Sequence, residues 1–331
     1  MRSPLTTASD DAIAAAIVRG WNLQMSALQY VPEGGGAYHW IADVDDGRRF
    51  FITCDDLAIK PWLGSDCDSV FGGLLDAYGT AIDLRASGSA FVVAPLANVS
   101  GDAAERVDER HSVSVFHHVT GEPGRWGQPL EESTLRELVT VLAELHGSVP
   151  VRPIARRPFA VPRRDELAEA LAVVDRRWEG GPFSESARAL LTEHRDAIDR
   201  MLDDLDHLAK AVPATDVLTH GEPHPGNLIR TDAGLVMVDW DTVAVAPRER
   251  DLWMLDIGDG TLLEMYEDVT GVAIDRDALV AFRLLWAVSD LASFVALLHG
   301  EHEATVDARR SLTAMRMILE HEEPWPHGAP R

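Results

Sequence analysis

The first 120 residues carry apolar and polar positions in the patterns of β-strands, with two helical stretches among them. Alternating or continuous apolar runs predict four strands, at 37–44, 48–54, 90–96 and 112–119. The first two flank "DDG" at 45–47, which indicates a hairpin turn. Helical spacing is found instead at 1–21 and at 65–87. This part of the chain is therefore predicted to be mostly β, with one hairpin and two helical stretches.

From residue 131 onward the spacing of apolar residues becomes helical. The segment 133–147 places several leucines on one face, with Ser133 or Thr134 as the expected cap and Gly147 as the stop. Four further helices are predicted, at 164–178, 184–210, 276–299 and 303–320. The segregation of strands and helices favours an α+β protein with two lobes, divided as 1–120 and 121–331.

Composition narrows the classes of partner. The formal net charge of −24 argues against binding nucleic acid and suits a cationic small substrate. The only cysteines are Cys54 and Cys67, too few for a disulfide framework. No apolar run reaches the roughly 18 residues needed to span a membrane, and the N-terminus lacks a secretory apolar block. We therefore expect a cytoplasmic protein without membrane contact.

The stretch "LTHGEPHPGNLI" at 218–229 contains two histidines, a glutamate and an asparagine that could act in catalysis or binding. Its prolines and glycines exclude a helix, so these side chains are expected on one rigid loop. Two short strands follow, joined by the turn "TDAG" at 231–234. Folding that hairpin sets Asn227 opposite Val238, so Asp239 lies diagonally across from Asn227, roughly 5–8 Å away. An amide oxygen and a carboxylate are ligands that Mg²⁺ accepts. The hairpin thus predicts a Mg²⁺ site with Glu222 beside it.

Three segments, "HGEPHPGN", "MVDWD" and "PRERDLWML", resemble the aminoglycoside phosphotransferase family, which includes choline and homoserine kinase-like enzymes. Weaker similarity extends to "GGGAYHW", "VTVLAELHG" and "RLLWAVSDLASFV". The resemblance implies a bilobal protein-kinase-like fold with a small antiparallel-sheet N-lobe and a larger helical C-lobe. It also implies Mg²⁺-dependent transfer of the γ-phosphate of ATP or GTP to a hydroxyl of a small molecule.

The resemblance assigns roles to individual residues by their positions in these motifs. Asn227 and Asp239 would bind Mg²⁺, and Glu222 would orient the acceptor hydroxyl and accept its proton. His220 and Asp251 would brace the loop. The nucleotide would be held by backbone groups of the glycine loop and by the segment that contacts the base, here Gly34, Gly35, Gly36, His117 and Val119.

Two positions depart from the family pattern. Glu222 stands where the family has Asp, so the carboxylate reaches about 1 Å farther. Thr53 stands where the family has a lysine on the third strand, and Lys60, one of only two lysines in the chain, lies beyond that strand. Alternation puts Arg49 on the face of Thr53, so Arg49 could replace the lysine, or Mg²⁺ could carry more of the phosphate charge.

Acceptor contacts are the least defined by the sequence. His224, Asp241 and Asp290 are the candidates. The family resemblance and the acidic charge together favour a hydroxylated, cationic antibiotic as the acceptor. A kinase of a primary metabolite such as an amino alcohol, and a catalytically inactive nucleotide-binding relative, remain alternatives. A zinc hydrolase is disfavoured because "HGEPH" lacks a Pro-Cys-x-x-Cys partner.

Overall fold

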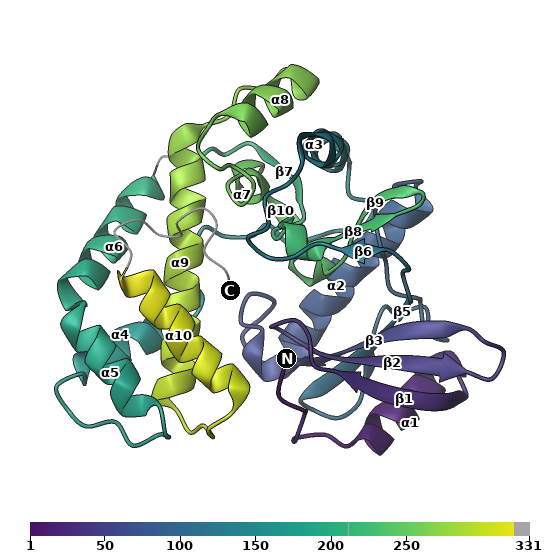
Figure 1. The fold of residues 1–331 in the computed structure, drawn as a ribbon, viewed down its shortest axis with the longest axis horizontal. Coiled ribbons are helices and arrows are strands. Elements are labelled where there is room, and N and C mark those ends of the chain that lie inside the picture. The colour runs from purple at the N-terminus through teal and green to yellow at the C-terminus, as the bar shows by residue number, and fades with distance from the viewer. Residues whose placement is uncertain (211, 321–331) are drawn as a thin grey trace. The chain divides into compact units, whose positions relative to one another are not determined.

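The computed structural model describes residues 1–210 and 212–320, which form two compact units (Figure 1). Unit 1 comprises residues 1–156 and 217–245, and unit 2 comprises 157–216 and the remainder from Ala246. The β-rich N-terminal part and the loop at 218–241 therefore belong to the same unit. The division expected at residue 120 remains a prediction about the lobes, since 121–156 and 217–245 group with the N-terminal residues by contact.

A five-stranded antiparallel sheet forms the first part of unit 1, in the order β1-β2-β3-β5-β4 (Figure 1). Its strands are β1 (Met25–Val31), β2 (Tyr38–Val44), β3 (Arg49–Asp56), β4 (Glu105–Arg106) and β5 (His111–His117). The hairpin predicted around "DDG" is confirmed as β2–β3, with Gly47 at a positive φ of 84°. The strand β1 was not predicted from the sequence. Its exposed and partly buried residues do not alternate regularly, so its sequence lacks the alternation of apolar and polar residues that indicates a strand.

One face of this sheet is apolar and carries the helix α1 (Asp10–Trp21). Ile13, Ala16 and Ile17 of α1 are fully buried against strand residues such as Trp40 and Ile52. Ser9 caps the helix by accepting a hydrogen bond from the Ala12 N–H. The N-terminal helix expected within 1–21 is thus confirmed, from residue 10 onward.

Two longer helices of unit 1 match their predictions closely. α2 (Cys67–Ala86) begins with a capping box in which Asp66 and Ser69 exchange hydrogen bonds. α3 (Glu132–Gly147) begins one residue earlier than expected, and its cap is Glu131, which makes no side-chain cap bond, rather than Ser133 or Thr134. Between them, the strand predicted at 90–96 is wrong. Only Val92 forms an isolated bridge, because Pro95 has no N–H to continue a ladder.

The rest of unit 1 is built around a small hairpin. β8 (Leu228–Thr231) pairs with β9 (Gly234–Met237) on one side and with β6 (Glu122–Pro123) on the other, and β7 (Asp216–Thr219) pairs with β10 (Ala244–Pro247). Short 3₁₀ turns lie beside these strands and after β3, namely η1 (Leu57–Ile59), η2 (Pro225–Asn227) and η3 (Trp240–Thr242).

Unit 2 is helical and is organised around α9 (Arg276–His299), which has the predicted bounds (Figure 1). The surrounding helices are α4 (Arg164–Ala172), α5 (Ser184–Glu193), α6 (Arg195–Leu208), α7 (Glu249–Leu252), α8 (Thr261–Thr270) and α10 (Val306–Glu320). The single helix predicted at 184–210 is broken at His194 into α5 and α6.

α9 is the helix that bears on the expectation that no apolar run is long enough to span a membrane. Of the helices within 1–210 and 212–320, it alone is long and apolar enough by length and composition, with a mean hydropathy of 1.7 over its most apolar window. The core helix of a folded unit passes the same test, and 56% of that window is buried inside the structure. Leu291, Ala292 and Val295 are among its fully buried side chains.

Candidate active site

The hairpin β8–β9 has the predicted register. Leu228 pairs with Met237, Ile229 with Val236, and Arg230 with Leu235. One step further, the Val238 N–H donates to the Asn227 carbonyl oxygen at 3.0 Å. The prediction that Asn227 lies opposite Val238 is therefore confirmed, and Asp239 follows immediately on the facing strand. A tight turn has brought together two residues twelve positions apart.

His220 ties the loop that precedes β8 to the chain leading into Asp239. Its ring nitrogen Nε2 lies 3.0 Å from the Val238 carbonyl oxygen, and its Nδ1 accepts a hydrogen bond of 3.2 Å from the Glu222 N–H. These partners assign the neutral tautomer with the proton on Nε2. The ring is fully buried and packs edge-on against Trp240. This geometry supports the bracing role expected for His220.

The Asn227 side chain is oriented by the same loop. Its amide nitrogen donates to the Glu222 carbonyl oxygen at 3.0 Å, and the side chain is largely buried. Because the nitrogen is engaged, the amide oxygen is the atom left to ligate a cation. Asp239 has a left-handed backbone with φ of 67°, a conformation that a non-glycine residue adopts at a cost of order 1 kcal/mol. Backbone strain of this kind is common at functional sites, where it fixes the orientation of a side chain.

Carboxylates gather around Asp239. Burial among protein atoms raises the pKa of the Asp239 carboxyl well above its ordinary value, and the charges of Asp241 and Glu222 raise it further. Asp239 nevertheless remains exposed to solvent, so an ion can reach it. Mutually repelling carboxylates at an accessible position favour a bound cation.

Lys60 is the cation buried within this group. Its Nζ lies 2.5 Å from Asp241 Oδ2 and 2.9 Å from Asp55 Oδ1. The side chain is 2% exposed, and Asp55 is fully buried. Burial opposes the charge of Lys60, yet Asp241 and Asp55 raise its pKa above the ordinary value. Sequence reasoning missed this pairing; the signal available was a lone lysine shortly after the acidic pair at the end of β3.

The turn η1 fixes the backbone that carries Lys60. The Asp56 carboxylate caps η1 by accepting a hydrogen bond of 3.1 Å from the Ala58 N–H. Arg110 donates to both Asp56 oxygens, at 2.8 and 2.6 Å, and its carbonyl accepts from the Leu57 N–H at 2.8 Å. Lys60 therefore follows a turn held by both side-chain and backbone bonds.

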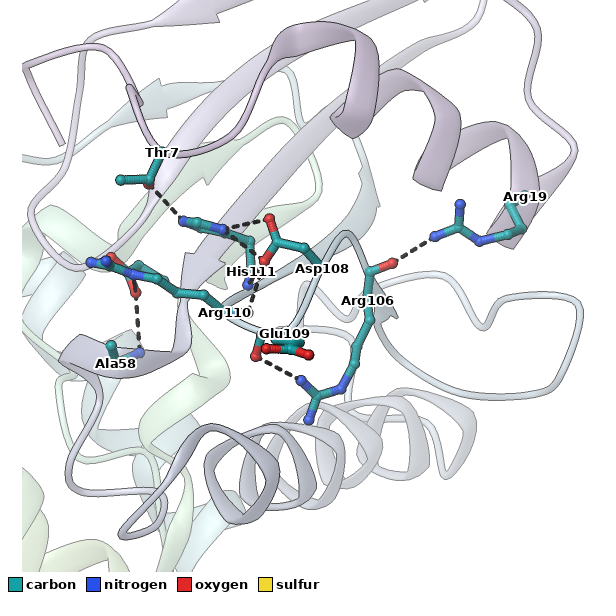
Figure 2. A network of polar contacts seen from close by, with 9 residues as sticks. Thr7, Arg19, Ala58, Arg106, Asp108, Glu109, Arg110 and His111 are labelled. Carbon is teal, nitrogen blue, oxygen red and sulfur yellow. Dashed lines mark hydrogen bonds and ion pairs between the residues drawn. The ribbon is translucent and has the colours of Figure 1, made fainter.

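The hairpin that presents Arg110 is itself braced, as Figure 2 shows. The His111 ring is buried, with Nε2 at 2.8 Å from Thr7 Oγ1 and Nδ1 at 3.0 Å from Asp108 Oδ1. Arg106 donates to the Glu109 carbonyl oxygen across the same turn. The position of Lys60 is thus set by a network that reaches back to the N-terminal segment.

Arg49 is not placed to substitute for the missing strand lysine. It lies at the start of β3, four residues before Thr53, and four residues of strand span about 13 Å. Its side chain is 55% exposed and pairs with Asp43 at 2.7 Å. Alternation correctly puts Arg49 on the face of Thr53, but at the far end of the strand. The exposed pair with Asp43 counts against Arg49 as the substitute, and its assignment to nucleotide binding stays a prediction.

The glycine loop joins β1 to β2 and is exposed. Gly34 has a positive φ of 75°, and added Cβ atoms on Gly35 and Gly36 would meet open space. His117 ends β5 and is exposed, and its ring stacks on Phe50. Val119, partly buried, lies in the connection from β5 to β6.

The remaining candidates fall in different places. His224 lies close to Glu222, with 3.7 Å between Nε2 and the carboxylate, and contacts the Trp126 ring edge-on. Asp241 is buried and paired with Lys60, and its role as an acceptor contact stays a prediction. Asp251 on α7 is fully buried and Asp290 on α9 is partly buried, both in unit 2.

In the part of the chain that the structure describes, no three His, Cys, Asp or Glu side chains are arranged to hold a metal. Mg²⁺ is bound through one or two protein ligands, with waters and phosphates completing its coordination. The Asn227 and Asp239 pair suits that requirement.

Comparison with known proteins agrees with this geometry. A model of the phosphotransferase enzyme family matches residues 83–282. Protein StrN of Streptomyces griseus is 27% identical over 282 residues, covering 80% of each chain.

Among solved structures, a spectinomycin phosphotransferase, APH(9)-Ia, in complex with ADP and spectinomycin, matches with a TM-score of 0.72 at 16% identity, covering 96% of this chain and 97% of the other. The choline kinase LicA from Streptococcus pneumoniae matches with a TM-score of 0.54 at 13% identity, covering 93% of this chain and 99% of the other. The resemblance and the α+β kinase-like fold inferred from the sequence are confirmed, and the chain belongs to the phosphotransferase enzyme family, as a small-molecule kinase.

Proposed function

We propose that this protein transfers the γ-phosphate of ATP or GTP to a hydroxyl group of a small antibiotic, with Mg²⁺ as the cofactor. The observation that carries the proposal is the convergence of Glu222, Asn227 and Asp239. The Asn227 amide donates to the Glu222 backbone, and the Glu222 charge acts on Asp239. Three groups suited to orienting an alcohol and a metal are therefore close together on one braced loop and hairpin.

Each group has a role in the transfer. The acceptor oxygen attacks the γ-phosphorus, the bond from that phosphorus to the bridging oxygen breaks, and the nucleoside diphosphate leaves. Glu222 accepts the hydroxyl proton. Asn227 and Asp239 would hold Mg²⁺, which when bound offsets the charge of the phosphate groups. Because phosphoryl transfer depends chiefly on positioning, His220 contributes by keeping the loop in place, and Asp251 is proposed as a second structural residue.

The nucleotide is expected to lie against the N-terminal sheet. Backbone N–H groups of Gly34, Gly35 and Gly36 are proposed to contact its phosphates, since these exposed glycines allow close approach. The segment containing His117 and Val119 is proposed to contact the base. Solved structures with this fold contain ADP, AMP or AMP-PNP, which supports a nucleotide donor.

An antibiotic acceptor is supported by charge and by the comparisons. The net charge of −24 favours a cationic molecule. The similar structures include a spectinomycin phosphotransferase bound to spectinomycin and a macrolide 2'-phosphotransferase. His224 and Asp290 stay as proposed acceptor contacts. Resistance through phosphorylation in the cytoplasm, where the nucleotide donors are, is the role we propose.

An amino alcohol acceptor is the second candidate, favoured by the match to a choline kinase. A panel of hydroxylated antibiotics and amino alcohols, each incubated with Mg²⁺ and either ATP or GTP, separates the two. The readouts are release of nucleoside diphosphate and the mass of one added phosphate group on the acceptor. Binding of nucleotide with no transfer to any acceptor would favour the catalytically inactive alternative.

Glu222→Gln provides the internal test of mechanism. It keeps the size of the side chain and removes the basic oxygen, so we expect transfer to be lost while nucleotide binding persists. Asp232→Asn, an exposed carboxylate in the turn of the same hairpin, is the matched control. Equal transfer by Glu222→Gln and the wild type would remove Glu222 from the proton transfer.

A further inference from the structure

The two faces of the N-terminal sheet differ in chemistry. The face covered by α1 is apolar, whereas the opposite face carries a polar row formed by His39, Thr53 and Ser114, neighbours across β2, β3 and β5. Thr53 and Ser114 are buried, and Ser114 Oγ has no hydrogen-bond partner among the described residues. Burying a polar group without a partner is unfavourable, so the buried Ser114 hydroxyl at the end of this row indicates a function other than stability.

The His39 ring lies between the glycine loop and the strand position that lacks a lysine. A Cβ added to Gly34 would be 3.0 Å from His39 Nε2, so the loop backbone passes directly over the ring. His39 Nδ1 is 3.4 Å from Thr53 Oγ1, and the ring stacks on Phe51 with 5.0 Å between centroids. These contacts fix the imidazole beside the proposed phosphate site, and His39 is only partly buried.

Other cations of unit 1 are less well placed. Lys60 is buried, and its charge is already compensated by the carboxylates of Asp55 and Asp241. Arg49 lies about 13 Å along the strand and binds Asp43. His39 is the side chain that combines access with proximity to both the loop and Thr53.

We propose that His39 takes the place of the missing strand lysine and binds phosphate oxygens of the nucleotide donor, an inference that rests on the proposed function. The phosphates carry several negative charges, which favour the protonated ring with two N–H donors.

The electrostatic surroundings make this contact dependent on pH. In the free protein, burial together with the charges of the Met1 amino group and Lys60 lowers the pKa of His39 to about 3. Asp55, on the same face as Thr53, is paired with Lys60, and the covering loop contributes Glu33. The ring is therefore neutral before binding and takes up a proton when the phosphates arrive. Because binding and protonation are linked, affinity for nucleotide falls as the pH rises.

Nucleotide affinity gives the test, measured with a non-hydrolysable triphosphate and Mg²⁺ between about pH 6 and pH 8, the range in which histidine switches. We expect wild-type affinity to fall across this range. His39→Gln should bind about tenfold more weakly at the low end, the loss expected for one hydrogen bond to a charged group, with little pH dependence. His39→Lys should restore affinity, also without the pH dependence.

His207→Gln, at an exposed position on α6, is the matched control and should behave as wild type. Thermal unfolding of each variant checks folding, and NMR of the histidine ring nitrogens in the wild type reports protonation of His39 without mutation. Unchanged affinity and pH dependence in His39→Gln, or a ring that stays neutral with nucleotide bound, would overturn the inference. Failure of the wild type to bind any nucleotide would instead overturn the proposed function.

Discussion

The interior around α9 in unit 2 and the interior around Lys60 in unit 1 contain different kinds of side chain. The α9 cluster is apolar, with Leu291, Val295 and Leu298 fully buried at its centre. The Lys60 cluster, formed by Lys60, Asp55, Asp239 and Asp241, contains three acids and one base. Packed apolar side chains stabilise without needing specific partners, whereas buried charges are stable only as a complete set.

The difference between the two clusters predicts that mutations in the α9 cluster affect stability alone, whereas mutations in the Lys60 cluster also affect catalysis. Loss of one apolar side chain should weaken unit 2 and leave the chemistry of unit 1 intact. Loss of the Lys60 charge should disturb both the fold and the position of Asp239. Variants that change one property without the other measure how far this separation holds.

The largest effect is expected for Lys60→Met. It leaves Asp55 and Asp241 buried without a counter-charge, which typically costs about 3–5 kcal/mol in the free energy of unfolding. Denaturant unfolding measures it. Leu291→Ala is the comparison in unit 2, with a loss of about 2–5 kcal/mol and unchanged transfer by the folded protein. Adding Asp241→Asn to Lys60→Met should recover part of the stability; purely additive losses would contradict the pairing.

Asp239→Asn should have the opposite profile. It removes a carboxylate that its neighbours disfavour, so the free protein should be as stable as the wild type or more stable. Transfer should fall at least about a hundredfold in kcat/KM, because the metal contact that positions the phosphate is lost. Steady-state kinetics with thermal unfolding checks both. A destabilised but fully active variant would assign Asp239 to the fold alone.

Stabilisation by Mg²⁺ should increase with pH. Since the pKa of Asp239 is raised in the folded protein, its contribution to stability is complete below the ordinary carboxyl pKa and is lost as the pH rises through the raised value. Mg²⁺ needs the ionised form and reverses that loss over the same range. The shift in Tm on adding Mg²⁺, followed against pH, measures this effect, which Asp239→Asn should lack. A shift independent of pH would count against the site.

The smallest effect is expected for Arg49→Ala. The exposed ion pair with Asp43 is screened by solvent and lies far along β3 from Thr53. We therefore expect the KM for nucleotide to be unchanged, in contrast to His39→Gln. A clear rise in that KM would return Arg49 to the phosphate site.

Local patterns were sufficient for much of the fold. The bounds of α9 and the pairing of β8 with β9 follow from helical spacing and from a turn that fixes its own register. Predictions failed where distant contacts decide the structure. Phe91 and Val93 form hydrogen bonds with Met237 of β9 and Val92 makes only an isolated bridge, so residues 91–93 dock on β9 and do not form a strand of their own.

The candidate site shows the same division. Asn227 and Asp239 are separated by a short hairpin, so their approach could be predicted from the sequence. Lys60 and Asp241 are 181 residues apart, and no local pattern brings them together. Alternation gave the correct face for Arg49 but not its distance from the site. Position along a strand matters as much as the face on which a residue lies.

The docking of residues 91–93 on β9 has a consequence for the rigidity of the metal site. Met237 donates its N–H to the Phe91 carbonyl oxygen, and its own carbonyl accepts from the Val93 N–H. With β8 on its other side, β9 is enclosed along both edges just before Asp239. The strand that leads to the Asp239 carboxylate is therefore held on both sides. The amide hydrogen of Met237 can exchange with solvent only when residues 91–93 detach from β9.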